Sequence, residues 1–596
     1  MNNYRSPLTD LRFVIHQVLK APQVLATLPA HAETGAEIID AVLEEGGRFC
    51  DQIVGPLYQE GDKGCRFENS TVSTPKGFKE AYDAFTGGGW SGLTAPAEEG
   101  GQGLPYVLDG AFKELINGAN VAWGTFPLLG HGAVEALRHY GEDWQKQVFL
   151  APLVDGRWTG TMCLTEPHCG TDLGLLKTRA EPLDDARYAI SGQKIFITAG
   201  EHDLTDNIIH LVLARLPDAP AGVRGISLFV VPKFKVDREG NVGERNAVSC
   251  GSIEHKMGLH GSATCVMNFD GAEGYLVGAP HKGLSAMFVM MNSARLGVGI
   301  QGLGLIERAW QNALPYANDR LQMRAASGPA YPDKPADPLI VHPDIRRMLL
   351  TCRAFAEGGR VLALYATLQA DIARHAGDEA ARAEAETVVG FLTPIVKGLL
   401  TEAAVECAYH AQQVYGGHGY IAEWGMEQIA RDARITTIYE GTTQIQALDL
   451  IGRKTLLADG AGLKLVLGRI AAFCKEHAGN AALSGLLPAL AQRAEQWGGL
   501  TQKIGASAAA DANVAAAAAY DYLFYSGYVT LAWCWAQRVA AAESSSASAA
   551  FKQAQREVAA FYFSKLLPRA DYHAAAIVAG PSSLMALADA DLGVQG

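Results

Sequence analysis

The sequence lacks the features of a secreted, zinc-binding or membrane-spanning protein. Its ten cysteines form no C-x-x-C pair and no His/Cys cluster at zinc spacing, which favours free thiols in a reducing compartment. Arg5, Asp10 and Arg12 precede any apolar run, so the N-terminus does not resemble a secretory signal. The longest uncharged apolar stretch, residues 522–537, is shorter than the roughly 20 residues of a spanning helix. We predict a cytoplasmic protein with no integral membrane segment and no metal site, in which this stretch is a buried bundle helix.

Positive charge is also scarce. The chain carries 50 Lys and Arg residues against 63 Asp and Glu residues, a formal net charge of −13. This balance disfavours nucleic acid or an anionic membrane as the main partner. With 48% hydrophobic and 19% charged residues, the composition is that of an ordinary globular protein. A length of 596 residues is too great for one hydrophobic core and predicts several domains.

The hydrophobic pattern changes twice along the chain. The first third has mostly helical apolar spacing after a proline-interrupted arm. Short strand-like runs bounded by turn residues follow, such as IIHLVLA at residues 208–214 and GISLFVV at residues 225–231. Helical periodicity then returns and continues into an Ala-rich C-terminal segment. We predict an α+β protein made of an arm, an α-helical domain, an all-β domain, a second α-helical domain and an extra C-terminal helical domain, at residues 1–40, 41–160, 161–278, 279–455 and 463–596.

Two glycine-rich segments imitate a dinucleotide-binding motif. Residues 87–92 (GGGWSG) and residues 297–302 (GVGIQG) both satisfy G-x-G-x-x-G. The first follows a helical pattern and the second lies inside one, so neither has the strand–turn–helix context that the motif requires. We therefore expect no Rossmann-type NAD site.

The most informative motif is YEGTTQ at residues 439–444. Glu440 stands between an aromatic residue and a glycine, directly before an amphipathic helical pattern. Thr442 or Thr443 can cap that helix, which would place Glu440 at its positive end. A carboxylate held on such a turn can stay ionised while partly buried, as a general base requires. Taken alone, an ordinary acidic residue at a helix N-terminus is the commoner explanation.

Three further segments favour the catalytic interpretation. They are MCLTEPHCGTDLG at residues 162–174, ISGQKIFITAG at residues 190–200, and QVYGGHGY at residues 413–420 followed by RDAR at residues 431–434. In this order, with Glu440 last, the segments closely resemble the motifs of the FAD-dependent acyl-CoA dehydrogenases. The resemblance extends from about residue 90 to about residue 453. The arm and the C-terminal extension resemble the large bacterial members, in particular the 3-methylmercaptopropionyl-CoA dehydrogenase subgroup and its fatty-acyl relatives.

The resemblance implies a fold and a reaction. The fold is an N-terminal α-helical domain, a middle β-barrel or β-sandwich domain and a C-terminal four-helix bundle, here with an extra helical domain. In the reaction Glu440 removes the α-proton of an acyl-CoA thioester and the β-hydride passes to N5 of FAD, which gives a trans-2-enoyl-CoA. The flavin ribityl hydroxyl and the Glu440 backbone N–H would bind the thioester oxygen. Some relatives carry the base on another helix, but the corresponding residue here, Ala294, has no carboxylate.

The resemblance also implies the FAD contacts. Leu164 and Thr165 would meet the flavin pyrimidine edge, and Phe196 and Thr198 would pack beside the ring, although β-domain packing is the alternative for these side chains. Arg320 and the residue 413–417 loop would reach FAD across a subunit interface. Pro343 stands where the family has Gln, which leaves the adenine contacts there open. The expected cofactor residues are Met162, Leu164, Thr165, Gly170, Thr171, Phe196, Thr198, Arg320, Gln413, Gly416, Gly417, Thr442 and Gln444.

The implied partners are an acyl-CoA, an electron-transfer flavoprotein and a second copy of the chain in a homodimer. Arg295, Tyr439 and Gly441 would lie on the substrate side, with a surface-exposed helix arginine as the alternative for Arg295. The sequence leaves acyl length open, and with it the choice between fatty-acid β-oxidation and 3-methylthiopropanoyl-CoA oxidation. Two alternative functions remain: an acyl-CoA oxidase that uses O2, and a non-enzymatic DNA-associated flavoprotein. The second requires a basic C-terminal domain, which this chain lacks.

Overall fold

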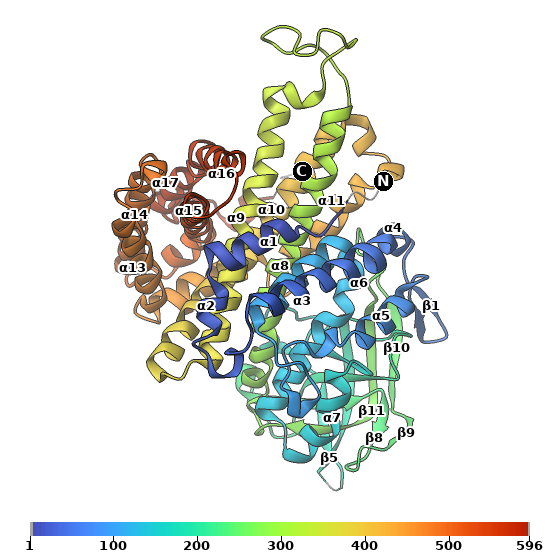
Figure 1. The fold of residues 1–596 in the computed structure, drawn as a ribbon. Helices are drawn as coiled ribbons and strands as arrows, with labels where there is room; N and C mark the ends of the chain where they lie inside the picture. The colour runs from blue at the N-terminus through green and yellow to red at the C-terminus, as the bar shows by residue number, and fades with distance from the viewer. Residues whose placement is uncertain (1–3, 185, 594–596) are drawn as a thin grey trace.

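The computed structural model describes residues 4–184 and 186–593 and begins with a helical region (Figure 1). The longest helix of this first region, α6 (Tyr106–Tyr140), is interrupted at Asn120, which has φ −162° and ψ 93°. A hairpin of β1 (Arg66–Glu68) and β2 (Thr71–Ser73) projects from this region. The helices are α1 (Leu8–Arg12), α2 (Ala21–Leu25), α3 (Ala36–Phe49), α4 (Tyr58–Gly61), α5 (Phe78–Gly87), α6 (Tyr106–Tyr140) and α7 (Asp143–Val154).

A seven-stranded sheet forms the middle of the chain. Its order is β10-β11-β5-β4-β6-β3, and β7 pairs with both β11 and β6, so β11, β5, β4, β6 and β7 close a ring. The long strand β11 pairs with three partners, and its pairings with β10 and β5 contain register shifts. The strands are β3 (Trp158–Cys163), β4 (Arg179–Pro182), β5 (Arg187–Thr198), β6 (Asn207–Arg215), β7 (Ile226–Pro232), β10 (Val248–Ile253) and β11 (Thr264–Val277), with a separate pair of β8 (Phe234–Val236) and β9 (Val242–Arg245).

Three long helices form the second helical region: α8 (Gly283–Asp319), α9 (Pro343–His375) and α10 (Glu379–Tyr415). The glycine-rich segment of α8 is a packing surface, because a Cβ at Gly299 or Gly302 would lie within 3.0 Å of the α10 backbone. This close packing explains why the second G-x-G-x-x-G match, at residues 297–302, is not a nucleotide site. The segment between α8 and α9 projects from the top of the view in Figure 1. Beyond α10 follow α11 (Met426–Arg434), α12 (Thr443–Leu448) and a π-helical continuation from Asp449 to Leu456.

The C-terminal helices pack beside α9 and α10 (Figure 1). They are α13 (Ala461–Glu476), α14 (Leu487–Ala508), α15 (Asn513–Ser544), α16 (Ala549–Phe561), α17 (Arg569–Ala579) and α18 (Ser582–Met585). Residues 522–537 lie in the buried part of α15, which confirms the prediction of a buried bundle helix. The order of helical, β and helical regions with an added helical region confirms the predicted α+β fold class.

Within the residues that the structure describes, two helices are long and apolar enough to cross a membrane by length and composition alone. They are α8 and the segment Glu379–Gly419, but 56% and 78% of their most apolar windows are buried inside the protein. Both serve as core helices of the second helical region, since α8 and α10 pack directly on each other.

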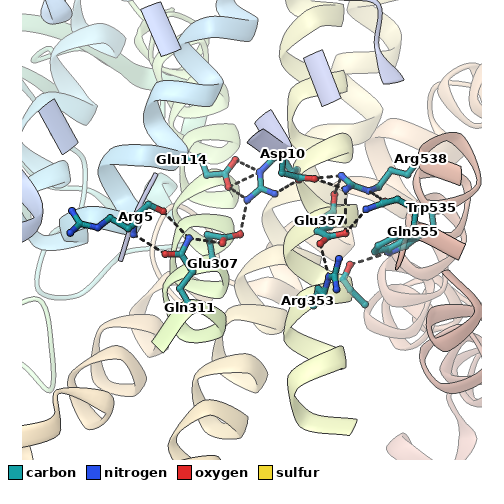
Figure 2. A network of polar contacts seen from close by, with 12 residues as sticks. Arg5, Asp10, Glu114, Glu307, Gln311, Arg353, Glu357, Trp535, Arg538 and Gln555 are labelled. Carbon is teal, nitrogen blue, oxygen red and sulfur yellow. Dashed lines mark hydrogen bonds and ion pairs between the residues drawn. The ribbon is translucent and has the colours of Figure 1, made fainter. Parts of the chain in front are cut away.

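The N-terminal arm is fastened by a buried network of charges (Figure 2). Asp10 of α1 pairs with Arg360 of α9 and Arg538 of α15, two arginines that are at most 1% exposed. Arg360 also donates to both oxygens of Glu114 at 3.0 and 3.1 Å and to Glu307 at 2.7 Å. One arm carboxylate therefore joins the second helical region to the C-terminal helices.

Candidate active site

Glu440 lies on a tight turn between α11 and α12. Its φ is +54°, in the left-handed region that a residue with a side chain rarely adopts, and Gly441 follows with φ +85°. The Thr442 hydroxyl accepts a hydrogen bond from the Ile445 amide at 3.3 Å and caps α12, as predicted for Thr442 or Thr443. The backbone of this turn therefore depends on support from its surroundings.

Neighbouring helices and the turn itself supply that support. Gln446 donates from Nε2 to the carbonyl oxygens of Glu440 and Gly441 at 3.1 and 3.3 Å. Lys397 of α10 donates from Nζ to the Gly441 carbonyl at 2.8 Å. The Tyr439 hydroxyl donates to Oε1 of Gln301, a fully buried residue of α8, at 2.6 Å. Helices α8 and α10 therefore both hold the turn in place.

The Glu440 carboxylate is half-buried and receives no hydrogen bond from any residue in the described ranges. Burial raises its pKa to about 7, against the opposing effect of the positive charges of Arg295 and Lys397. The Glu440 backbone N–H likewise has no acceptor within residues 4–184 and 186–593. A carboxylate with this pKa can accept a proton near neutral pH, and the amide is available to a substrate carbonyl.

Arg295 lies beside Glu440 and is 4% exposed. It donates from NH1 to Oδ2 of Asp449 at 3.2 Å, so the alternative of a surface-exposed helix arginine does not hold. Burial lowers the pKa of its guanidinium, although the charge of Asp449 opposes this shift. Ala294, the preceding residue, is also buried.

The predicted flavin-contacting residues cluster at one end of β3 and β5. Met162 is buried in β3, and Leu164 and Thr165 follow directly after that strand. The Ile195 amide donates to the Thr165 carbonyl at 2.9 Å, which joins the two strands at this point. Phe196 has φ +59° and a side chain that is 58% exposed, so it offers an open aromatic face.

Sequence reasoning missed the pair that organises this loop. Lys194 is fully buried and donates from Nζ to the Leu164 carbonyl at 3.0 Å and to Glu166 at 2.8 Å. Glu166 also accepts from Thr178 and from the Lys177 amide. The sequence did offer one sign of this pair: Lys194 occupies an inward-facing position in a strand pattern, and a lysine is rarely buried unless it is paired.

The same loop brings three possible metal ligands together. One ligand atom each of Glu166, His168 and Cys169 lies within 4.8 Å of the others. The two Glu166 oxygens already accept hydrogen bonds from Lys194, Thr178 and Lys177, so the carboxylate has its partners within the protein.

The remaining predicted cofactor residues lie on exposed surface. Arg320 ends α8 and residues 413–417 end α10, and the two ends meet where the Tyr316 and Tyr415 rings stack at 3.9 Å. Arg320 is 25 positions from Arg295 on α8, roughly 37 Å at 1.5 Å per residue. The structure therefore does not bring Arg320 near Glu440 in the same chain. The other exposed positions are Gly170, Thr171, Gln413, Gly416, Gly417 and Gln444, with Thr198 and Thr442 half-buried.

A separate cavity lies between α5, α6 and β3. Its wall includes Ser91, Asn117, Leu128 and His131, and none of the predicted site residues. Leu128 packs against α8, where a Cβ at Gly297 would lie 2.9 Å from its Cδ1. Because the cavity wall contains none of the predicted site residues, we take the Glu440 turn as the candidate active site.

The exposed surface fits a flavin dinucleotide. Phe196 presents an aromatic face at the strand ends, and Gly416 and Gly417 have no heavy atom within 4 Å of a Cβ position, so their backbone is open to a ligand. Four family models cover the chain: the acyl-CoA dehydrogenase N-terminal domain (residues 40–157), middle domain (161–272) and C-terminal domain (281–456), and the acetyl-CoA dehydrogenase C-terminal-like domain (466–588).

Curated relatives agree with these matches. The chain is 47% identical over 569 residues to a 3-methylmercaptopropionyl-CoA dehydrogenase of Ruegeria pomeroyi, covering 95% of this chain and 96% of the relative. It is 37% identical to the broad-specificity linear acyl-CoA dehydrogenase FadE5 of Mycobacterium tuberculosis, covering 81% and 80%. It is 35% identical to a butyryl-CoA dehydrogenase of Syntrophomonas wolfei, covering 79% of each chain.

Solved structures show the same fold. Caenorhabditis elegans ACDH-11 in complex with C11-CoA matches with a TM-score of 0.76 at 20% identity, covering 94% of this chain and 91% of that chain. A Bacillus anthracis acyl-CoA dehydrogenase complexed with FAD matches with a TM-score of 0.74 at 19% identity, covering 93% and 90%. Fold and site together define a flavoprotein oxidoreductase. The chain belongs to the acyl-CoA dehydrogenase family, and it is an FAD-dependent enzyme that acts on acyl-CoA thioesters.

Proposed function

We propose that Glu440 is the base that removes the α-proton of the acyl-CoA. The observation that supports this role is a carboxylate on a strained turn, with no hydrogen-bond donor among the described residues and a pKa raised to about 7. Its own N–H is free to donate to the thioester carbonyl, whose oxygen gains negative charge as the α-proton leaves. Arg295 and Lys397 supply positive charge beside the carboxylate.

FAD supplies the hydride acceptor for the β-carbon when it is bound. We propose that Leu164 and Thr165 hold its pyrimidine edge, that Phe196 and Thr198 pack beside its ring, and that the loop of Gly170 and Thr171 binds its pyrophosphate. The Lys194–Glu166 pair supports this assignment, because it fixes the backbone of the loop that would carry these contacts. Met162, Thr442 and Gln444 would complete the site, and Tyr439 and Gly441 would line the substrate side.

We propose 3-methylmercaptopropionyl-CoA as the substrate, with short straight-chain acyl-CoAs as the alternative. The proposal rests on the 47% identity over 95% of the chain to the Ruegeria relative that bears this name. The relatives named for butyryl-CoA and linear acyl-CoA substrates are more distant, at 35% and 37% identity.

We further propose a homodimer whose FAD is shared between subunits. Arg320 and residues 413–417 lie together at the far ends of α8 and α10, too far along α8 to serve the same chain's Glu440 turn. A second copy can bring these residues to the cofactor. We propose an electron-transfer flavoprotein as the acceptor, and a reducing cytoplasm as the location because all ten cysteines are free.

Substitution of the base tests the proposed role of Glu440. The variant Glu440→Gln keeps the size of the side chain but cannot accept the proton. We expect it to retain FAD and bind acyl-CoA, and to reduce its flavin at least ~100-fold more slowly than wild type. Anaerobic stopped-flow bleaching of the flavin absorbance measures this rate. Bleaching at the wild-type rate would assign the base to another residue.

A substrate panel tests the second part of the proposal. Turnover of 3-methylmercaptopropionyl-CoA and of straight-chain acyl-CoAs of increasing length with an artificial electron acceptor ranks the acyl groups by kcat/KM. Turnover under air without an electron-transfer flavoprotein, with release of peroxide, would replace the dehydrogenase assignment with an oxidase.

A further inference from the structure

Lys397 is a fully buried lysine that lies in the middle of α10. The surrounding sequence, PIVKGLL at residues 394–400, is apolar apart from this residue. No carboxylate among the described residues lies within ion-pairing distance of its Nζ, whose hydrogen bond is to the Gly441 carbonyl at 2.8 Å. A buried ammonium without an ion pair is costly in free energy, so its position calls for a compensating interaction.

The compensating interaction lies at the catalytic turn. Glu440 and Glu402 stabilise the charged form of Lys397, while Arg295 opposes it. Burial nevertheless lowers the pKa of Lys397 to about 8, so the side chain remains mostly charged at neutral pH. The Nζ of Lys397 thus contacts the carbonyl of Gly441, the residue after Glu440, and its positive charge lowers the pKa of the Glu440 carboxylate.

The turn also needs mechanical support at this carbonyl. Glu440 and Gly441 both have positive φ, a region that a residue with a side chain adopts only at a cost in free energy. The Gly441 carbonyl accepts from Lys397 at 2.8 Å and from Gln446 at 3.3 Å. Five residues further along α10, Glu402 accepts a hydrogen bond from the Thr443 hydroxyl at 2.6 Å, at the start of α12. Helix α10 therefore holds the turn from one side.

We propose that Lys397 is a positioning residue that fixes the Glu440–Gly441 turn through the Gly441 carbonyl and keeps the Glu440 carboxylate ionised near neutral pH. This inference rests on the proposed role of Glu440 as the base. Lys397 itself touches neither the Glu440 carboxylate nor the reacting atoms, and it acts through the turn and through its charge.

The charged and titratable groups around Glu440 come from four elements. They are Arg295 from α8, Lys397 and Glu402 from α10, Tyr439 from the turn itself, and Asp449 and Arg453 from the continuation of α12. Asp449 pairs with Arg295 and Arg453. This pairing partly offsets the charge of Arg295, whereas Lys397 has no carboxylate paired to it in the described chain. Removing Lys397 therefore removes a positive charge that acts on Glu440 and is not held in a direct ion pair with another carboxylate.

The sign of the effect on the pH profile follows from this arrangement. Glu440 must be ionised to accept a proton, so flavin reduction is lost as the pH falls through the Glu440 pKa. Loss of the Lys397 charge favours the protonated form and raises that pKa further. The acidic limb of the rate profile should then move to higher pH by about one unit, the lower end of the effect of a nearby opposite charge.

The test uses three variants of the FAD-loaded enzyme. Lys397→Met removes charge and donor, Lys397→Gln keeps a donor without the charge, and Lys397→Arg keeps the charge. Flavin reduction by 3-methylmercaptopropionyl-CoA is followed anaerobically from pH 5.5 to 9.5. Lys464→Met is the matched control, because it removes an exposed lysine charge on α13.

We expect the Met and Gln variants to lose about tenfold in rate at pH 6.5 and to recover most of it at pH 9, while the Arg variant keeps the wild-type profile. If the Met variant does not fold, the Gln and Arg variants decide. A loss that is equal at all pH values, or no shift of the limb in Lys397→Gln, overturns the proposal. Glu440→Gln is measured in parallel to separate the two hypotheses. Flavin bleaching by Glu440→Gln at the wild-type rate refutes the role of Glu440 as the base. If Glu440→Gln is inactive and the acidic limb of the Lys397→Gln profile does not move, only the inference about Lys397 is refuted.

Discussion

Glu114 and Glu440 are two carboxylates whose pKa burial raises to about 7, and they have opposite surroundings. Glu114 is fully buried in the network of Figure 2, and both of its oxygens accept hydrogen bonds from Arg360. Glu440 is half-buried, and no described residue donates to its carboxylate. A raised pKa therefore does not by itself mark a catalytic group. Free oxygens that a substrate can reach make the difference.

The two regions also distribute charge differently. In the network, Arg360 and Arg538 hold the pKa of Asp10 at about 2 against the effect of burial, and Asp10, Glu114 and Glu307 each pair directly with an arginine. At the Glu440 turn, Lys397 has no paired carboxylate among the described residues and Arg295 shares Asp449 with Arg453. The first arrangement fastens helices together, and the second leaves charge available for chemistry.

Removing one arginine from the network should give the largest change in stability. Arg360→Met leaves Glu114 and Glu307 buried without their partner, and we expect a loss of about 3–5 kcal/mol in the free energy of unfolding. Urea denaturation measures this loss. At a temperature where the variant is folded, its rate of flavin reduction should equal that of wild type.

Arg353→Met is the matched control for that prediction. Arg353 is partly exposed and pairs with Glu357 one turn away on the same helix, so its removal should cost less than about 1 kcal/mol. If Arg360→Met slowed flavin reduction as strongly as it lowered stability, the network and the Glu440 turn would not be separate systems.

As at the Glu440 turn, we expect the unpaired charge of Arg320 to mark a contact with a ligand. Its guanidinium is exposed and has no ion pair among the described residues, unlike that of Arg324, which bonds to Asp337. We expect Arg320→Ala to weaken FAD binding by about 2 kcal/mol, the value of a charge-assisted hydrogen bond. The Tm should fall in parallel, and excess FAD should restore part of it.

Calorimetry with and without added FAD measures both effects, and Arg324→Ala is the comparison variant. Light scattering adds the oligomeric state. Full FAD occupancy in a monomer would contradict a cofactor shared between subunits.

The sequence was informative where function imposes a local pattern. Glu440 with its capping threonine, the strand ends at Thr165 and Phe196, and the buried stretch of α15 all follow from short motifs or from hydropathy. The helical context of the second glycine-rich segment correctly excluded a Rossmann site.

Partners distant in sequence were not predictable in this way. Lys397 precedes the residue it supports by 44 positions, and Asp10 bonds to residues more than 300 positions away. A single lysine in a helical pattern, or an aspartate in the N-terminal arm, is ordinarily expected to face solvent. Whether it is buried depends on which helices pack around it, and the local sequence does not show this. An apolar run on all sides of Lys397 was the one local sign that α10 is buried.

The last predicted effect concerns the pH dependence of stability rather than rate, and it distinguishes the Glu440 turn from the network. The folded-state pKa of Glu440 is about 7, above the ordinary value of 4.5. Between these values the folded state binds more protons than the unfolded state, so this group lowers stability as pH rises from about 4.5 to 7. Asp10 acts in the opposite sense, since its depressed pKa stabilises the fold above about pH 4 and this contribution is lost as pH falls towards 2.

Glu440→Gln should therefore have a higher Tm than wild type at pH 8 and the same Tm at pH 4.5, whereas Asp10→Asn should have a lower Tm at both. Differential scanning calorimetry of the FAD-loaded proteins at the two pH values measures these differences. A Glu440→Gln variant that is less stable than wild type at pH 8 would show that the carboxylate stabilises the turn, as the carboxylates of the network stabilise theirs.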